Sequence, residues 1–265
     1  SINHKIGFFE LWLVKNVCLT RLIECTAITG MHSYTIPTSK AKLKLLDSVE
    51  LLVSQKGFDA VSVRDVTQLA KANVASVNYH FGSRDGMMAL MISRRMSPIH
   101  EEQLKGLNLL EKKRGNKSLP LEELLSALLG PLFMKEHPKS GSKPEVMRQC
   151  VARILALSVD ALPQPLQESG SLVWSNYLKA LGKCLKELGR EELVWRLHMV
   201  TGTAIQTLVG TDPIEAWVGK IPGDQELESR FSRLLRLASA MMREGGMIGS
   251  QIEDKPKGPQ GTFDF

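Results

Sequence analysis

The stretch from residue 38 to residue 96 limits the fold more than any other part of the chain, because helix caps there alternate with apolar residues at helical spacing. From Thr38, apolar residues three and four positions apart predict a helix that Ser39 can cap and that Gly57 ends. A second short helix begins after Ser62, and a third after Asn73, both good capping residues. We therefore expect three short helices that share one core.

The second and third of these helices are each predicted to bury one face. The second carries Val66, Leu69 and Ala70 on one side, and the third carries Val74, Val77 and Phe81 at spacings of three and four. Lys71 and Ala72 form the turn between them. Ser83 then caps a fourth helix, which we expect to end or kink near Pro98.

The remainder of the chain reads as further helices joined by connectors rich in Pro and Gly. Helical stretches are expected at about 98–113, 120–136, 143–160, 165–188, 190–210 and 224–244. Only 6% of the residues are aromatic, and strand-like runs of Val, Ile, Thr and Tyr are nearly absent. The fold class is therefore predicted to be all-α, with an N-terminal three-helix domain followed by a larger helical domain.

The predicted organisation has four parts. Residues 1–37 are expected to be a non-native or disordered extension and arm, with Met31 as the biological start. Residues 38–96 form the first domain, residues 97–245 the second, and residues 246–265 a disordered tail. Charged residues interrupt the apolar stretch from Phe8 to Ile28 too early for a membrane span, so no membrane association is expected. Four cysteines, Cys18, Cys25, Cys150 and Cys184, lack the spacing of a disulfide scaffold or a zinc site, which fits the cytoplasm.

Positive charge is concentrated in the first domain. From Lys40 to Met96 there are nine Lys or Arg against five Asp or Glu, which is most of the chain's formal charge of +6. Contacts to nucleic-acid phosphates need such an asymmetry.

The outer surface of the third short helix suits the major groove of DNA. Ala75 is small enough for close approach, Ser76 and Asn78 can hydrogen-bond base edges, and Tyr79 and His80 can reach phosphates. The unpaired amides of a helix that begins after Asn73 favour a phosphate. A three-helix bundle with a merely solvated polar face is the alternative.

The run SVRDVTQLAKANVASVNYHFGSRDGMMALM resembles the helix-turn-helix of the tetracycline-repressor (TetR-like) family. The resemblance implies that Ser62 and Arg64 contact phosphates, as does Arg84 at the start of the fourth helix. It also implies that four residues face the bases: Asn73, Ala75, Ser76 and Asn78. Lys71 stands where the family usually has Gly, and costs strain if the backbone there needs a positive φ.

Beyond the first domain the resemblance is one of helical layout. It implies a homodimer formed by the helices at about 190–210 and 224–244. Their apolar stripes are Leu193, Leu197, Val200, Ala204 and Leu208, then Leu227, Phe231, Leu234, Ala238 and Met241, with Gly202 and Thr203 small enough for close contact. A core within one subunit is the alternative for these stripes.

A pocket for an unknown small-molecule effector, with a preference for an apolar or aromatic compound, is expected among the helices from 120 to 210. Its candidate lining residues are Phe133, Met134, Met147, Trp174, Tyr177, His198 and Met199. Met fills gaps in any helical interior, so ordinary core is the alternative for each of them.

No motif indicates catalysis. His100-Glu101-Glu102 lacks a second His, and Ser140 and Lys143 lie in a connector without a partner motif. We therefore expect no enzyme, no metal and no cofactor. The predicted function is a DNA-binding transcriptional regulator, a repressor that an effector releases from a pseudo-palindromic operator. The alternatives are an activator of the same fold, or a helical enzyme with an incidental helix-turn-helix.

Overall fold

The computed structural model describes residues 39–115, 118–133, 142–210, 217–219 and 227–243. Backbone contacts divide the chain into residues 1–36 and residues 37–265, and every described residue belongs to the second unit. These residues form helices and no strand, so the predicted all-α class is confirmed. Among them, no helix is both long enough and apolar enough to cross a lipid bilayer. The predicted extension and the predicted tail lie outside the described residues.

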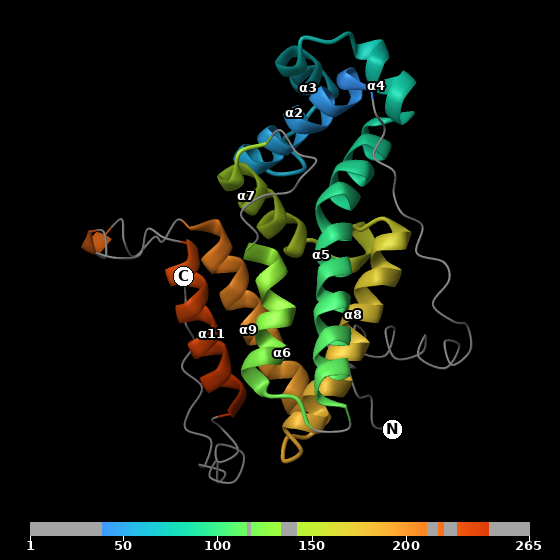
Figure 1. The fold of residues 1–265 in the computed structure, drawn as a ribbon. Coiled ribbons are helices and arrows are strands. Elements are labelled where there is room, and N and C mark those ends of the chain that lie inside the picture. The colour runs from blue at the N-terminus through green and yellow to red at the C-terminus, as the bar shows by residue number, and fades with distance from the viewer. Residues whose placement is uncertain (1–38, 116–117, 134–141, 211–216, 220–226, 244–265) are drawn as a thin grey trace, which may run out of the picture. The chain divides into compact units, whose positions relative to one another are not determined.

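Four successive helices, each with a polar side-chain cap, build the N-terminal part of the unit (Figure 1). They are α2 (Lys40–Lys56), α3 (Val63–Ala70), α4 (Val74–Phe81) and α5 (Arg84–Arg114). The side chains of Ser39, Ser62, Asn73 and Ser83 each accept a hydrogen bond from a backbone N–H in the first turn, as predicted. Such a bond satisfies an amide that the helix itself leaves unpaired.

Helix α5 does not end at Pro98, near which the sequence predicted that the helix ends or kinks and that a further helical stretch begins. Pro98 cannot donate a backbone hydrogen bond, which ordinarily costs a helix about 3 kcal/mol. Met96 and Ile99 on either side are buried, and so is Leu107 further along. Burial on both sides of the proline offsets the lost bond, and α5 becomes a single helix of 31 residues. The predicted boundary between residues 96 and 97 falls inside it.

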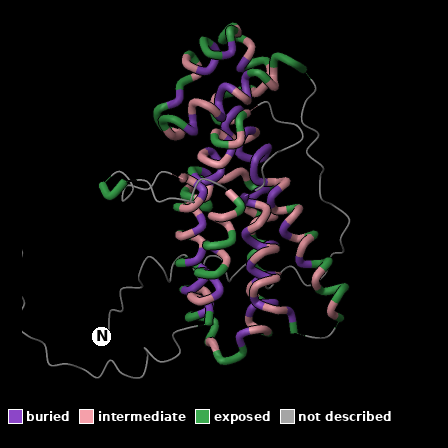
Figure 2. The backbone as a smooth tube through the Cα atoms, turned by 60° about the vertical axis from the view of Figure 1, so that its left-hand side comes forward, coloured by how far each residue is buried: buried purple, intermediate pink, exposed green. Residues whose placement is uncertain are grey.

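The remaining helices agree with the predicted stretches. They are α6 (Leu121–Leu129), the 3-10 turn η2 (Gly130–Phe133), α7 (Pro144–Leu155), η3 (Val159–Ala161), α8 (Gln164–Cys184), α9 (Arg190–Val209) and α11 (Leu227–Arg243). Helix α5 packs against α6 and α8, while α11 packs against α9 and α6. Figure 2 shows that the buried residues lie on the sides of these helices that face one another.

The apolar stripe of α9 is part of the core of its own subunit. All five residues of the stripe are buried, and Leu234 and Ala238 of α11 are buried with them. The alternative of an intramolecular core therefore holds for this stripe, because α11 and α7 cover it. The exposed side of α9 is a different face, which carries Trp195, Met199 and Gly202.

A buried ion cluster joins α2 to α5. The fully buried carboxylate of Glu50 pairs with Arg95, and its other oxygen lies 3.3 Å from a guanidinium nitrogen of Arg94. Arg94 also pairs with Asp47 at 2.8 Å, and both arginine side chains are 1% exposed. Ser142 donates a hydrogen bond of 2.5 Å to Glu50. The cluster fixes the first helix of the N-terminal part to the long helix α5.

Helix α7 holds the other end of α2. Arg153 donates hydrogen bonds to the backbone oxygens of Ser54 and Gln55, at 3.2 and 3.3 Å. These carbonyls belong to the last turn of α2, where a helix leaves its acceptors unpaired and favours a positive charge. The orientation of α2 is therefore set by contacts from both α5 and α7.

Candidate nucleic-acid interface

Helices α3 and α4 form a helix-turn-helix whose turn has a defined backbone. Ser62 and Asp65 make a capping box, in which the Ser62 hydroxyl accepts from the Asp65 N–H and the Asp65 carboxylate accepts from the Ser62 N–H. Lys71 ends α3 in the left-handed region, with φ +51° and ψ +48°. A side chain in that region costs roughly 1–2 kcal/mol, so the strain expected for a Lys at this usual Gly position is present.

The carboxylate of Asp65 is held by the residues around it. The Ser62 backbone N–H and the Lys56 ammonium, 3.0 Å away, lower the pKa of Asp65 to about 2. This acid is therefore ionised but tied to the start of α3 and to α2. Its negative charge is matched by Lys56 beside the helix-turn-helix.

The outer face of α4 is open to solvent. Ala75, Asn78 and Tyr79 are exposed, with Tyr79 at 86%, while Ser76 and His80 are partly buried. Ser62, Arg64 and Asn73 are exposed as well. Neither Asp nor Glu occurs in α4, and the Asn73 side chain fixes its first turn through a 3.0 Å bond from the Ala75 N–H. The structure thus brings the predicted base-facing residues to one accessible helix.

The inner face of α4 differs from the prediction. Val77 is fully buried and Phe81 packs against the core, but Val74 is 51% exposed. Leu69 of α3, predicted to be on the buried side, is 44% exposed. Both residues lie at the helix ends nearest the turn, where no other described helix covers them.

Arg84 is engaged inside the domain. Its Nε donates to the Val61 carbonyl at 3.0 Å, and its Nη2 donates to the Phe58 carbonyl at 2.7 Å. These bonds tie the start of α5 to the loop before α3. The predicted phosphate contact of Arg84 stays a prediction, while the structure assigns this residue an anchoring role that the sequence pattern did not indicate.

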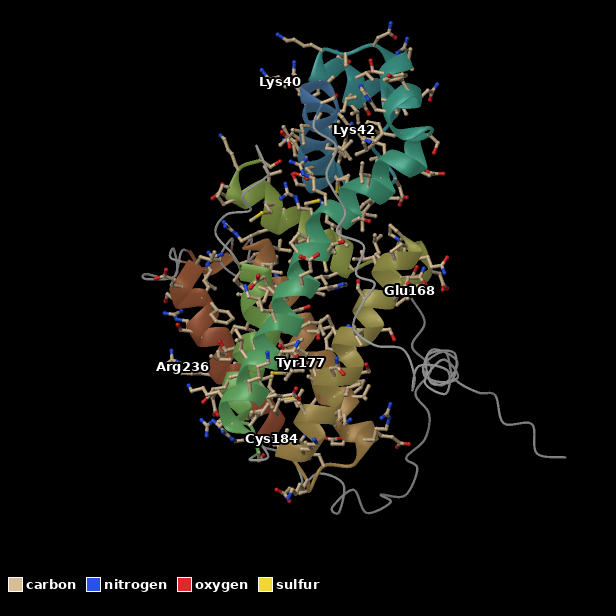
Figure 3. All side chains as sticks on the ribbon, turned by 45° about the vertical axis from the view of Figure 1, so that its right-hand side comes forward. Lys40, Lys42, Glu168, Tyr177, Cys184 and Arg236 are labelled. Carbon is tan, nitrogen blue, oxygen red and sulfur yellow. The ribbon has the colours of Figure 1, made fainter. Side chains whose placement is uncertain are left out.

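Basic side chains surround the helix-turn-helix. Lys40, Lys44, Arg64 and Lys71 are exposed, whereas Arg94 and Arg95, which contribute to the same sequence count, are buried against acids. Figure 3 labels Lys40 and Lys42 in the first turn of α2. The Lys42 ammonium lies 5.3 Å from the centre of the Phe81 ring, a cation–π contact that holds the end of α4 against α2.

The predicted effector-pocket residues do not gather in one place. Phe133 and Met147 are buried, and the Phe133 ring lies 5.2 Å from that of Phe231. Tyr177 is fully buried. Met134 lies outside the described residues.

Three of the predicted pocket residues face solvent instead. Trp174 is 39% exposed and Met199 is 45% exposed. His198 is also exposed, and its ring stacks on Trp195 at 6.0 Å. The prediction of an inward position is wrong for these three, because they occupy the outer faces of α8 and α9.

The hydrogen-bonded polar residues between α5, α6 and α8 were not predicted as a group. The hydroxyl of Tyr177, labelled in Figure 3, donates to the Gln103 carbonyl at 2.9 Å, and the Gln103 amide donates to the Leu128 carbonyl at 2.7 Å. His100 Nδ1 lies 2.8 Å from the Ser169 hydroxyl, and burial lowers the pKa of His100 to about 4. The sequence did contain one indication of these buried polar residues, because His100 and Gln103 lie three positions apart and therefore on one side of α5.

Comparison with known proteins gives matches on both parts of the chain. The family model for bacterial regulatory proteins of the tetR family matches residues 45–91, and the model for a tetracyclin repressor-like C-terminal domain matches residues 126–241. A probable HTH-type transcriptional regulator, YttP of Bacillus subtilis (strain 168), is 38% identical over 52 residues. That match spans 20% of this chain and only 25% of the YttP sequence.

Solved structures with a similar course of the backbone include two regulators described as TetR-family proteins. One, from Rhodococcus sp., has a TM-score of 0.48 and 16% identity, over 77% of this chain and 100% of the other. The other, PfmR from Thermus thermophilus, has a TM-score of 0.44 and 15% identity, over 75% and 97%. The two family models describe the N-terminal and C-terminal domains of one family and match successive parts of this sequence, so the chain belongs to the tetracycline-repressor (TetR) family.

Proposed function

We propose that this protein is a transcriptional regulator that binds operator DNA through the outer face of α4. The observation that carries the proposal is the accessibility of that face, on which Ala75, Asn78 and Tyr79 are exposed and no acid occurs. An α-helix of this kind fits the major groove, where Asn can form two hydrogen bonds with adenine. Family membership supports the same function.

Phosphate contacts would position α4 in the groove. Ser62 and Arg64 at the start of α3 are exposed, and the hydroxyl of Ser62 can donate to a phosphate while it accepts the capping bond. Tyr79 and His80 at the end of α4 would contact phosphates of the other DNA strand. Binding should weaken steeply with salt, because each neutralised phosphate releases counterions.

The regulator would act as a homodimer on a pseudo-palindromic operator. Its two copies of α4 would then enter successive major grooves, with centres about one DNA turn (~34 Å) apart. The exposed face of α9 is the proposed contact, since Trp195 is 51% exposed and Met199 45%. A Cβ atom on Gly202 of the same face would meet no other atom within 4 Å, so packing within the subunit does not require glycine there.

A small-molecule effector would release the DNA by favouring a conformer with a different separation of the two α4 helices. The usual coupling of 1–3 kcal/mol would weaken operator binding by roughly 5- to 150-fold. The buried polar residues between α5, α6 and α8 support a site there, since the Gln103 Oε1 atom is buried and accepts no hydrogen bond from the described residues. Of the predicted lining residues, Tyr177 belongs to this region, since its hydroxyl donates to the Gln103 carbonyl, while Phe133 and Met147 are buried on η2 and α7. Repression remains the proposed mode, with activation as the alternative.

The proposed DNA binding is tested by selecting bound duplexes from a random pool and measuring their affinity by gel shift. We expect an enriched sequence with two-fold symmetry, and relaxed preference at one position per half-site in Asn78→Ala, by about 1–3 kcal/mol. Asn108→Ala is the matched control, because Asn108 is an exposed asparagine near the far end of α5. A pool that shows no enrichment would count against the proposed function.

The proposed dimer is tested by sedimentation velocity. Met199→Arg should raise the dissociation constant of the dimer, because a charge would have to be buried in an apolar contact. Leu172→Arg is the control, since Leu172 is similarly exposed, at 44%, but lies on α8. If both variants sediment like the unsubstituted protein, α9 does not form the interface.

A further inference from the structure

Val74 occupies an unusual position for a branched apolar residue. It is the first residue of α4, is 51% exposed, and does not belong to the apolar core that the described residues form. The helix start does not depend on it, since Asn73 supplies the cap. Folding of the subunit therefore gives no reason for Val at this position.

Val74 shares its helix face with Asn78. The two residues are four positions apart, and residues at this spacing are neighbours on a helix surface. Both are exposed, and Ala75 and Tyr79 continue the same surface. Val74 is thus the larger aliphatic residue, beside Ala75, of the surface that the proposed function places in the groove.

The major groove offers one apolar group to such a side chain. The C5 methyl of thymine contacts apolar side chains there, whereas the other base edges present hydrogen-bonding atoms. Four residues of helix rise about 6 Å, and base pairs are about 3.4 Å apart. A contact made by Val74 therefore falls within about two base pairs of a contact made by Asn78.

We propose that Val74 determines specificity by contacting the methyl group of a thymine within two base pairs of the adenine that Asn78 contacts. The inference rests on the proposed function, because it requires α4 to lie in the major groove. Ala75, which is also apolar and exposed, ends at Cβ, whereas the side chain of Val74 reaches one carbon further and carries two methyl groups. Val74 is accordingly the residue that can cover a methyl group while the helix backbone stays clear of the bases.

The test is a uracil scan of the selected operator. Each thymine is replaced by deoxyuridine, which removes the methyl group and leaves the hydrogen-bonding atoms unchanged, and the affinity of each duplex is measured. Loss of one buried methyl should weaken binding about three- to fivefold per half-site. We expect this loss at one position per half-site, within two base pairs of the position at which Asn78→Ala relaxes the preference.

Val74 variants assign the contact. In Val74→Ala, thymine and uracil duplexes should bind equally at that position, while every other position responds as before. Val74→Ile should keep the preference for thymine, and Leu172→Ala, at an exposed apolar residue of α8, should leave it unchanged. Because Val74 is outside the core, these variants should fold, which circular dichroism checks.

Two results would overturn the inference. One is specific operator binding with no uracil-sensitive position near the Asn78 adenine. The other is a uracil-sensitive position that persists in Val74→Ala, which would assign the methyl contact to another residue. If the random pool gives no selected operator, the proposed function itself fails, and that outcome is distinguishable from both.

Discussion

Replacing Glu50 should destabilise the fold more than any other single loss of charge in the described part of the chain. Its carboxylate is fully buried, pairs with Arg95 and Arg94, and accepts a 2.5 Å hydrogen bond from Ser142. At 3.3 Å and an effective dielectric constant near 20, the pair of Glu50 with Arg94 gains roughly 5 kcal/mol of Coulomb energy. Desolvation of the three ions cancels most of that gain in the native protein, at several kcal/mol per ion.

Glu50→Gln removes the attraction but leaves both guanidinium groups buried. We therefore expect the free energy of unfolding to fall by about 3–5 kcal/mol, out of a total that is typically 5–15 kcal/mol. The measurement is equilibrium unfolding in urea, followed by circular dichroism at one fixed protein concentration because dimerisation contributes to stability. Asp47→Asn is the control, since Asp47 also pairs with Arg94 but its side chain is 33% exposed.

The control should lose about 1 kcal/mol or less, because Asp47 is partly open to water and Glu50 still neutralises Arg94 in that variant. A variant that replaces Glu50, Arg94 and Arg95 together by Met or Leu should recover most of the stability, because no buried charge is left unpaired. A loss below 1 kcal/mol in Glu50→Gln would refute the reasoning. Equal losses in Glu50→Gln and Asp47→Asn would refute it as well.

Three further predictions concern local features. Lys71→Gly should raise the free energy of unfolding by about 1 kcal/mol by removing left-handed strain, whereas Lys71→Ala should not; urea unfolding of both variants checks this. The pKa of His100 is lowered to about 4 in the folded protein by burial, so the unfolded chain binds the extra proton first as the pH falls. Stability should therefore decrease between about pH 6.5 and pH 4, by on the order of 3 kcal/mol, and His100→Gln should flatten that part of a pH series of thermal unfolding. Burial raises the pKa of the Cys150 thiol to about 12, so iodoacetamide at pH 8 should leave Cys150 unmodified until denaturant is added, as peptide mass spectrometry would show.

Features that depend on neighbours in the sequence could be predicted well. The caps Ser39, Ser62, Asn73 and Ser83 each bind an amide two or three residues ahead, so the residue type and the following pattern suffice to identify them. The strain at Lys71 was expected from the family resemblance, in which Gly is usual at this position of the turn, and the positive φ confirms it. The exposed face of α4 followed from helical periodicity once its start was known.

Features that depend on distant residues could not be predicted. Glu50 and its two arginines are about 45 positions apart in the sequence, and nothing near any of them indicates that the three are buried together. The same holds for Arg84, whose guanidinium binds carbonyls more than 20 positions away. The count of Lys and Arg between Lys40 and Met96 treats every charge as a surface charge. Arg94 and Arg95 are buried, however, and add no charge to the surface.

An apolar periodic pattern predicts that a helix has a face to cover, but it does not say what covers it. On α9 the regular stripe from Leu193 to Leu208 is covered within the subunit, and on α4 Val74 extends the stripe but nothing in the described part of the subunit covers it. The exposed apolar residues of the described part include Trp195 and Met199 on α9 and Val74 on α4, which are the residues proposed above to contact a second copy and DNA. Because folding of one subunit does not account for these three side chains, substitutions at them should change association with DNA or with a second copy while leaving the free energy of unfolding of the isolated subunit nearly unchanged.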